Sequence, residues 1–215
     1  MRFQTRYVAA VLALTGLSFS GIAAADENFG NFAGFVDLYY QPWAELETTL
    51  SVDDESVTNT TDGDGYGIKG LLKISDHLAL DGEYQTSDYD GSADRDTYRL
   101  GGGYYWRYFG VSADYINESI DDGNADTDDT TAEGYGVYVR SSWLAIKGVA
   151  FTGAIGYLRL DRGGNEFDGF EYNLGLDVRL NDYLGLFADY RASDLSYDNL
   201  DLHLSEARAG LRLVF

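Results

Sequence analysis

Only two histidines and no cysteine occur among the 215 residues, so acid–base chemistry near neutral pH would fall to one of two imidazoles. His203 has Asp201 two positions before it and Ser205 two positions after it. Residues two apart on a β-strand point to the same side, so either neighbour could reach the imidazole. Such a group could activate a water or a serine for hydrolysis if an acid orients the ring. His77 lies between two predicted strands, in a short turn, which leaves His203 as the catalytic candidate.

Both spacings around His203 resemble those of hydrolases built on membrane barrels. Asp201-Leu202-His203 resembles the Asp-x-His pair of the omptin proteases, and Asp88-Tyr89-Asp90 resembles their acidic pair. His203-Leu204-Ser205 resembles the His-x-Ser of lipid A deacylases. However, the chain is shorter than omptins, its Asp-x-His lies on the last predicted strand, and no acid is clearly placed to orient the imidazole. We therefore expect no enzymatic activity and expect His203 to be a polar residue at the outer rim.

A calcium-loop pattern begins at Asp122, where oxygen-bearing residues occupy the first, third, fifth, seventh and twelfth positions up to Glu133. Thr127 stands at the sixth position, where the sharp turn of such a loop needs glycine, and the flanking segments are predicted strands. We expect a solvated acidic loop that binds divalent cations only loosely, and we expect no cofactor.

Charged residues also recur at every second position of the apolar stretches, where they would share one face of a sheet. Ten basic residues and about eight acidic ones fall on this face, so their charges nearly balance. The candidate lumen network comprises Asp37, Lys69, Glu83, Arg99, Asp114, Asp189, Arg191 and Arg208. A turn at Asp76 would place Lys69 opposite Glu83, and closure of the sheet would bring Asp37 near Arg208. Charges in a confined interior must pair, which leaves open a packed polar core or a narrow charged channel.

The elements that would position these residues are predicted to be antiparallel strands. Apolar residues alternate with polar ones, as in Tyr172, Leu174 and Leu176. Ten ranges follow this pattern: 31–44, 65–74, 78–87, 96–106, 109–117, 133–141, 148–160, 169–180, 183–193 and 201–215. Both faces of 148–160 carry apolar residues, so its orientation is left unassigned and Arg159 is placed inward only provisionally. Eight strands are the alternative if a strand between 109 and 160 is misassigned.

The predicted connections alternate between short and long. Short turns fall at 75–77, 107–109, 141–147 and 181–183, whereas the longer acidic connections span 45–64, 88–95, 118–132, 161–168 and 194–200. This alternation is typical of outer-membrane barrels, and a β-sandwich gives no reason for it.

The last stretch places Leu211, Leu213 and Phe215 on one face and Arg208 and Arg212 on the other. A final strand that ends in Phe resembles the small outer-membrane β-barrels of Gram-negative bacteria, the OmpA-like and opacity-type porin families. The resemblance implies an all-β fold, a single antiparallel up-and-down barrel, with lipid on its apolar face. It also implies insertion by the barrel-assembly machinery through Phe215.

The N-terminal residues 1–25 have the features of a secretory signal peptide, with Arg2 and Arg6 before an apolar core and Ala23 and Ala25 at its end. We expect residues 26–215 to form one outer-membrane barrel domain. Removing the two arginines leaves thirteen basic against thirty-six acidic residues, which argues against nucleic acid as a partner.

The function expected from these patterns is structural or weakly porin-like, with small ions or solutes passing a charge-lined lumen. One alternative is adhesion through the acidic loops outside the cell. A second alternative is a barrel hydrolase that uses His203. The expected surroundings are outer-membrane lipid and lipopolysaccharide.

Overall fold

The structure, a computed structural model, describes residues 33–52, 55–90, 93–106, 108–121 and 130–215. The predicted signal peptide, Arg107 and most of the calcium-like loop lie outside the described residues. Within the described part, no helix is long and apolar enough to span a membrane.

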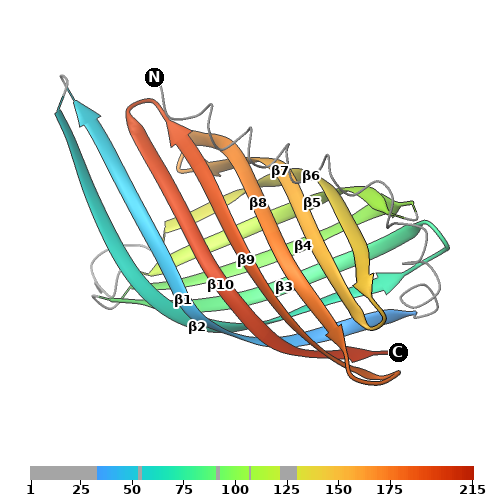
Figure 1. Cartoon of the computed structure of the whole chain (residues 1–215). Helices are drawn as coiled ribbons and strands as arrows, with labels where there is room; N and C mark the ends of the chain where they lie inside the picture. The colour runs from blue at the N-terminus through green and yellow to red at the C-terminus, as the bar shows by residue number, and fades with distance from the viewer. Residues whose placement is uncertain (1–32, 53–54, 91–92, 107, 122–129) are drawn as a thin grey trace.

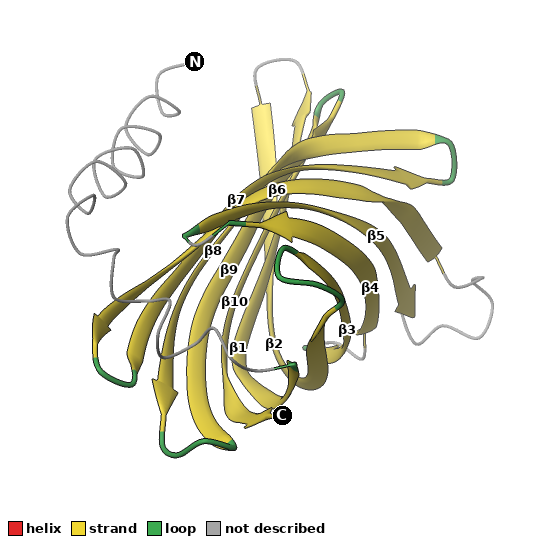
Figure 2. Cartoon of the chain, turned by 90° about the vertical axis from the view of Figure 1, so that its right-hand side faces the viewer, coloured by secondary structure: helices red, strands yellow, loops and turns green. Residues whose placement is uncertain are grey.

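Ten strands form one closed antiparallel barrel, in which each strand pairs with its neighbours in sequence and β1 pairs with β10 (Figure 1). They are β1 Gly34–Val52, β2 Glu55–Lys73, β3 Leu78–Tyr89, β4 Ala93–Tyr105, β5 Phe109–Asp121, β6 Thr130–Ile146, β7 Val149–Arg162, β8 Asn165–Arg179, β9 Leu184–Tyr197 and β10 Leu200–Val214. Figure 2 shows that every described element of regular structure is a strand. The predicted ten-stranded barrel is confirmed, and neither eight strands nor a sandwich fits the described residues.

We call the end that carries the β2–β3, β4–β5, β6–β7 and β8–β9 connections the turn end, and the opposite end the hairpin end. Several strands extend much farther toward the hairpin end than predicted. The predicted long connection 45–64 is wrong, because β1 and β2 continue as a hairpin until Val52 pairs with Glu55. The apolar residues Leu46, Leu50 and Val57 share one face, but polar residues between them weaken the alternation in the sequence, while the backbone ladder continues.

The connection predicted at 161–168 is likewise mostly strand. Arg162 pairs with Asn165, and Gly163 and Gly164 alone make the turn. Both glycines have positive φ (62° and 87°), which the two-residue turn of a tight hairpin requires and which side chains disfavour.

The outer surface of the barrel carries an apolar belt bounded by aromatic side chains. Leu100 and Leu174 lie in this belt with more than half of their side-chain surface exposed (68% and 55%). Exposed aromatic residues flank it toward the turn end at Trp106, Phe109 and Tyr183, and toward the hairpin end at Tyr40, Tyr66, Tyr98, Tyr115 and Tyr135. Two aromatic bands around an apolar belt are typical of barrels in a lipid bilayer.

The faces of β7, which the sequence left unassigned, are distinct in the structure. Leu158 and Leu160 point inward and are buried, whereas Ile155 and Tyr157 are exposed on the outer surface. Arg159 shares the outer face and pairs with Glu166, so its provisional inward placement is wrong. Apolar residues occupy both faces of β7 because its inward leucines belong to an apolar part of the lumen.

Candidate functional site in the barrel lumen

The lumen contains three layers, arranged from the hairpin end to the turn end. The first is an apolar cluster of buried side chains, which consists of Ile116, Ala132, Tyr138, Leu158, Leu160, Phe167 and Leu195. The second is a central network of charged and polar groups. The third is a cavity that opens at the turn end.

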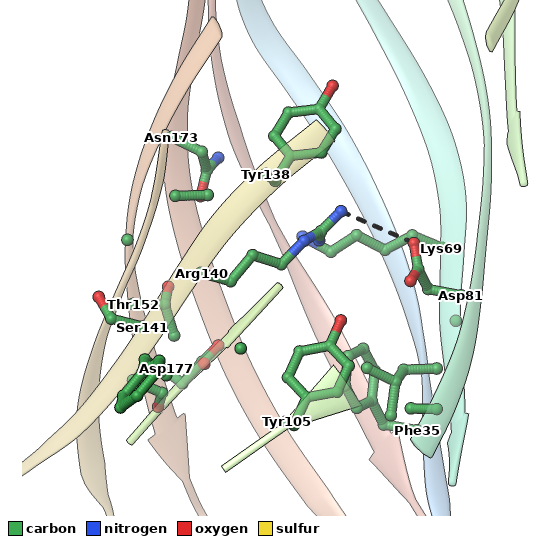
Figure 3. Close-up of a pocket in the computed structure, with 18 of the residues that line it drawn as sticks. Phe35, Lys69, Asp81, Tyr105, Tyr138, Arg140, Ser141, Thr152, Asn173 and Asp177 are labelled. Atoms are coloured by element: carbon green, nitrogen blue, oxygen red, sulfur yellow. Dashed lines mark ion pairs between the residues drawn. The ribbon is translucent and has the colours of Figure 1, made fainter. Parts of the chain in front are cut away.

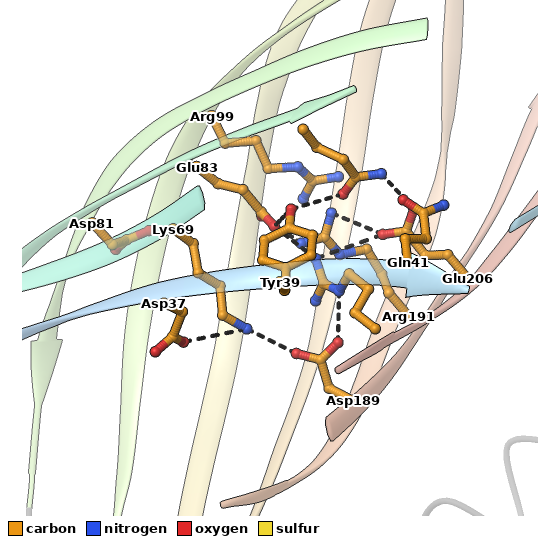
Figure 4. Close-up of polar contacts among 12 residues, drawn as sticks. Asp37, Tyr39, Gln41, Lys69, Asp81, Glu83, Arg99, Asp189, Arg191 and Glu206 are labelled. Carbon is orange, nitrogen blue, oxygen red and sulfur yellow. Dashed lines mark hydrogen bonds and ion pairs between the residues drawn. The ribbon is translucent and has the colours of Figure 1, made fainter. Parts of the chain in front are cut away.

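Glu83 is the centre of the central network (Figure 4). One carboxylate oxygen lies 2.5 Å from Nη2 of Arg191 and the other lies 2.7 Å from Nη1 of Arg208. The hydroxyl of Tyr39 donates to the same carboxylate at 2.7 Å. These four side chains come from three parts of the wall, β1, β3 and the β9–β10 pair, so the network crosses the lumen.

Lys69 lies directly opposite Glu83 in the β2–β3 ladder, as predicted. The predicted ion pair between them is nevertheless wrong, because Nζ of Lys69 reaches Asp189 at 2.8 Å and Asp37 at 3.8 Å. Glu83 is already bonded to two guanidinium groups that reach it from the opposite wall. Arginine binds a carboxylate with more donors than lysine does, which favours this exchange of partners.

The second predicted proximity, Asp37 with Arg208, is also wrong. Asp37 pairs in register with Arg212, and the guanidinium donates to both carboxylate oxygens at 2.8 Å. Arg208 instead lies beside the shift in register between Tyr40 and Trp43, and bonds to Asp189 at 2.6 Å. The ladder runs without a shift from Phe35–Val214 to Tyr40–Ala209, so the register at the strand ends sets the partner of Asp37, and the sequence pattern does not reveal that register.

The remaining predicted residues lie in two separate buried pairs. Arg99 binds Glu171 through two parallel hydrogen bonds of 2.8 and 2.7 Å. Asp114 accepts from Nη2 of Arg140 at 2.8 Å. The structure thus joins six of the eight predicted lumen residues in one connected group and places the other two in adjacent pairs.

Sequence analysis missed the uncharged members of the network. Gln85 donates to Glu206 at 2.8 Å and accepts from Tyr39 at 3.1 Å, while Ser87 donates to Gln41 at 3.1 Å. Gln41 lies on the same face of β1 as Asp37, and Gln85 and Ser87 lie on the same face of β3 as Glu83. The alternation of the sequence therefore predicts that all three point inward. A choice of lumen residues by charge alone leaves these three out.

These uncharged residues also show whether the lumen is open. Gln41, Gln85 and Glu206 point inward, yet at most 1% of the surface of each is exposed. Inward-facing groups in a water-filled channel would be in contact with solvent. The lumen is therefore filled by side chains at this level, as small barrels commonly are.

Two tyrosine rings fill the lumen because glycines on neighbouring strands make space for them. A Cβ added at Gly67 would meet the Tyr39 ring, and one added at Gly156 would meet the Tyr138 ring. The hydroxyl of Tyr138 accepts from Arg99 at 3.1 Å, which links the apolar cluster to the charged layer.

The cavity occupies about 860 Å³ of the lumen between the central network and the turn end (Figure 3). Arg140 projects into it between Tyr138 and Tyr105, 3.8 Å from Asp81. Its inner boundary includes Glu83 and members of the Arg99–Glu171 pair, and its mouth is formed by the turn residues. It is a blind vestibule that ends at the central network.

His203 lies outside the lumen, on the outer face of the part of β10 that extends beyond the apolar belt toward the hairpin end. Its Nδ1 contacts the carboxylate of Asp194, its ladder partner on β9. The hydrogen bond to Asp194 raises the pKa of His203, although partial burial opposes the shift. The acid beside the imidazole is therefore Asp194, nine positions earlier, and the sequence pattern missed it because it lies across a hairpin.

The acidic pair at Asp88 and Asp90 does not face this imidazole. Asp88 lies next to the end of β3, which β1 and β2 separate from β10 around the wall. Among the described residues, no group of three or more His, Asp or Glu side chains could hold a metal ion.

No protein-family model matches the chain, and no curated protein matches its sequence. Solved structures that resemble it are outer-membrane β-barrels, so the chain has the fold of that class of protein. The outer-membrane protease OmpT of Escherichia coli aligns with 87% of this chain and 98% of its own, at a TM-score of 0.55 and 6% identity. The COG4313 outer-membrane channel of Pseudomonas putida F1 aligns with 86% of this chain and 96% of its own, at a TM-score of 0.52 and 9% identity. The β-domain of the Bordetella autotransporter BrkA aligns with 86% of this chain and 100% of its own, at a TM-score of 0.51 and 14% identity. Identities this low establish the fold alone.

Proposed function

We propose that this protein is an outer-membrane barrel with a structural role, whose lumen is closed to the free diffusion of solutes and passes ions weakly at most. The observation that carries the proposal is the burial of Gln41, Gln85 and Glu206 at the centre of the lumen. Toward the hairpin end the lumen is next occupied by the apolar cluster and by the buried ion pair of Arg95 with Glu118. An ion would therefore have to displace a buried hydrogen-bonded layer and then pass a second level of buried side chains.

The proposed orientation places the turn end in the periplasm and the hairpin end outside the cell. Short turns on the periplasmic side and larger extensions on the outer side are typical of bacterial barrels. The cavity would then open toward the periplasm. Lipid would surround the apolar belt, and the acidic hairpins would lie beside lipopolysaccharide with loosely bound divalent cations. Insertion would depend on the barrel-assembly machinery and Phe215.

Planar-bilayer conductance of the refolded protein tests the closed lumen. We expect little or no steady conductance from the parent protein. The variant Leu158→Ala/Phe167→Ala removes two side chains of the apolar cluster and should increase any leak, whereas Leu174→Ala on the outer surface should not. Stable ohmic channels in the parent protein would contradict the proposal.

We also propose that the barrel is not a hydrolase. The Asp194–His203 pair faces outward, and Asp88 lies three strands away around the wall, so among the described residues these groups do not converge on one substrate. Peptide or lipid A turnover that is lost in His203→Ala, with folding intact, would contradict this assignment.

A further inference from the structure

The outer half of β2 is a sheet edge that no described strand covers. Residues Gly63 to Lys73 pair with β3, and Asp62 accepts one further hydrogen bond from Asp90, but the seven residues from Glu55 to Thr61 have ladder partners only on β1. Every residue from Glu55 to Thr60 is exposed, including Val57 with 71% of its surface in solvent. In Figure 1 this end of the β1–β2 hairpin extends clear of the neighbouring strand β3.

The orientation of the backbone groups along this edge follows from the ladder. The carbonyl of Asp62 accepts from the amide of Asp90, so it points away from β1. In an antiparallel strand the direction alternates, and Ser56, Thr58 and Thr60 therefore also point their N–H and C=O groups away from β1. The hydroxyls of Thr49 and Thr58 lie 2.9 Å apart, as expected of a directly opposed pair that exchanges no backbone hydrogen bonds.

A partner must therefore supply a complementary ladder and complementary charge. Residues 45–64 contain seven acidic residues and no basic one. The face of the hairpin that continues the outer surface carries Glu45, Glu47 and Asp62, while the other face carries Leu50 and Val57. Opposite charges on neighbouring strands stabilise a sheet, whereas like charges directly opposed destabilise it.

We propose that the outer edge of β2, Glu55–Asp62, binds an extended basic segment of another protein by strand addition. In this mode backbone hydrogen bonds to Ser56, Thr58 and Thr60 provide affinity, and alternate side chains provide selectivity. Lysine or arginine would lie on the acidic face and small apolar residues beside Val57. A second copy of this chain is disfavoured as the occupant, because its own edge is equally acidic.

The test uses the full barrel in zwitterionic micelles and a fluorescent synthetic peptide that alternates lysine with valine or threonine and is long enough to span residues 55–62. Thr60→Pro removes an N–H that points to the free edge and leaves the ladder with β1 intact, whereas the matched control Thr60→Ala keeps the N–H. A peptide methylated on alternate backbone nitrogens keeps the charge and loses the donors.

We expect the parent protein and Thr60→Ala to bind the peptide equally, and Thr60→Pro to bind it about tenfold or more weakly, as the loss of a hydrogen bond and steric blocking predict. The methylated peptide should not bind. A difference in migration between unboiled and boiled samples in SDS gel electrophoresis shows that each variant folds. Equal binding by Thr60→Pro, equal binding of the methylated peptide, or no binding by the parent protein would overturn the proposal. Self-association of the parent that Thr60→Pro abolishes would also overturn it, in favour of a second copy.

Discussion

At the residue scale, the lumen is held by charges whose partners come from distant parts of the chain. Lys69 and Asp189 are 120 positions apart, and Arg208 and Glu83 are 125 apart. Breaking one buried ion pair leaves an uncompensated charge, whereas replacing both members with apolar residues of similar volume is often neutral. Removing one member of a pair should therefore lower the stability of the barrel much more than replacing both members.

The Arg99–Glu171 pair offers the cleanest test, because each side chain is only 6% exposed and the geometry is bidentate. Glu171→Gln should lower the free energy of unfolding by about 3 kcal/mol, since Arg99 keeps its charge in a buried site. The double variant Arg99→Met/Glu171→Leu should recover most of this loss. Urea unfolding in lipid vesicles measures both effects.

The control for this comparison is Asp182→Asn, at the exposed Arg179–Asp182 pair, which should change stability little. If Arg99→Met/Glu171→Leu loses as much stability as the single variants Arg99→Met and Glu171→Leu added together, Arg99 and Glu171 are not coupled and the proposed pairing is wrong.

The second prediction at this scale concerns pH. Asp194 raises the pKa of His203 above its ordinary value near 6.5, so the folded state holds this proton more tightly than the unfolded state. The stabilising contribution is fully present below the unfolded pKa and is lost as the pH rises through the folded pKa. NMR titration of the His203 ring should show a raised pKa that Asp194→Asn lowers. Asp201→Asn, two residues away on the same face, should leave it nearly unchanged.

The residue types of the site could be predicted from the sequence, but the partners could not. Alternation assigns Lys69, Glu83 and Arg208 to the interior, because each falls on the polar face of its strand. The partner of each charged residue in the lumen depends on the tilt of the strands and on the register shift near Trp43. Neither feature leaves a local signal in the sequence.

At the element scale, the strands were predictable where one face meets an apolar environment and the other does not. The pattern fails where both faces are alike. Residues 45–64 carry only scattered apolar residues on one face, so the sequence predicts a loop there. β7 is apolar on both faces because Leu158 and Leu160 enter the apolar cluster. A period of two is informative only when the two environments differ.

Amide hydrogen exchange tests the free edge of β2 without any ligand. The amides of Val57, Asn59 and Thr61 should exchange about tenfold or more slowly than those of Ser56, Thr58 and Thr60, because only the first three donate to β1. NMR of the folded protein in micelles resolves these residues. Uniform protection along 56–61 would mean that another segment covers the edge, and uniformly fast exchange would mean that the hairpin end is not formed.

At the scale of the whole molecule, the barrel has the reverse of a soluble protein's arrangement, with charges and amides inside and an apolar belt outside. The chain has 36 acidic and 15 basic residues, and charges of opposite sign pair in the lumen, whereas many of the described acidic residues without a basic partner lie on the strand extensions toward the hairpin end. Within the apolar belt the closed sheet satisfies the backbone of each strand without water, which is the condition for crossing a bilayer.

The last prediction separates a belt that faces lipid from one that faces water. Val139 lies on the outer face of β6 midway between Trp143 and Tyr135, with 52% of its surface exposed. An exposed Val→Arg change costs little in water, but at the middle of a bilayer Val139→Arg should destabilise the barrel by about 2–4 kcal/mol. Thr131→Arg, on the same strand and face beyond Tyr135, should cost about 0–1 kcal/mol, because it lies outside the belt. Urea unfolding from vesicles, followed by tryptophan fluorescence, measures the difference, and equal costs at the two positions would show that β6 does not cross the bilayer at this height.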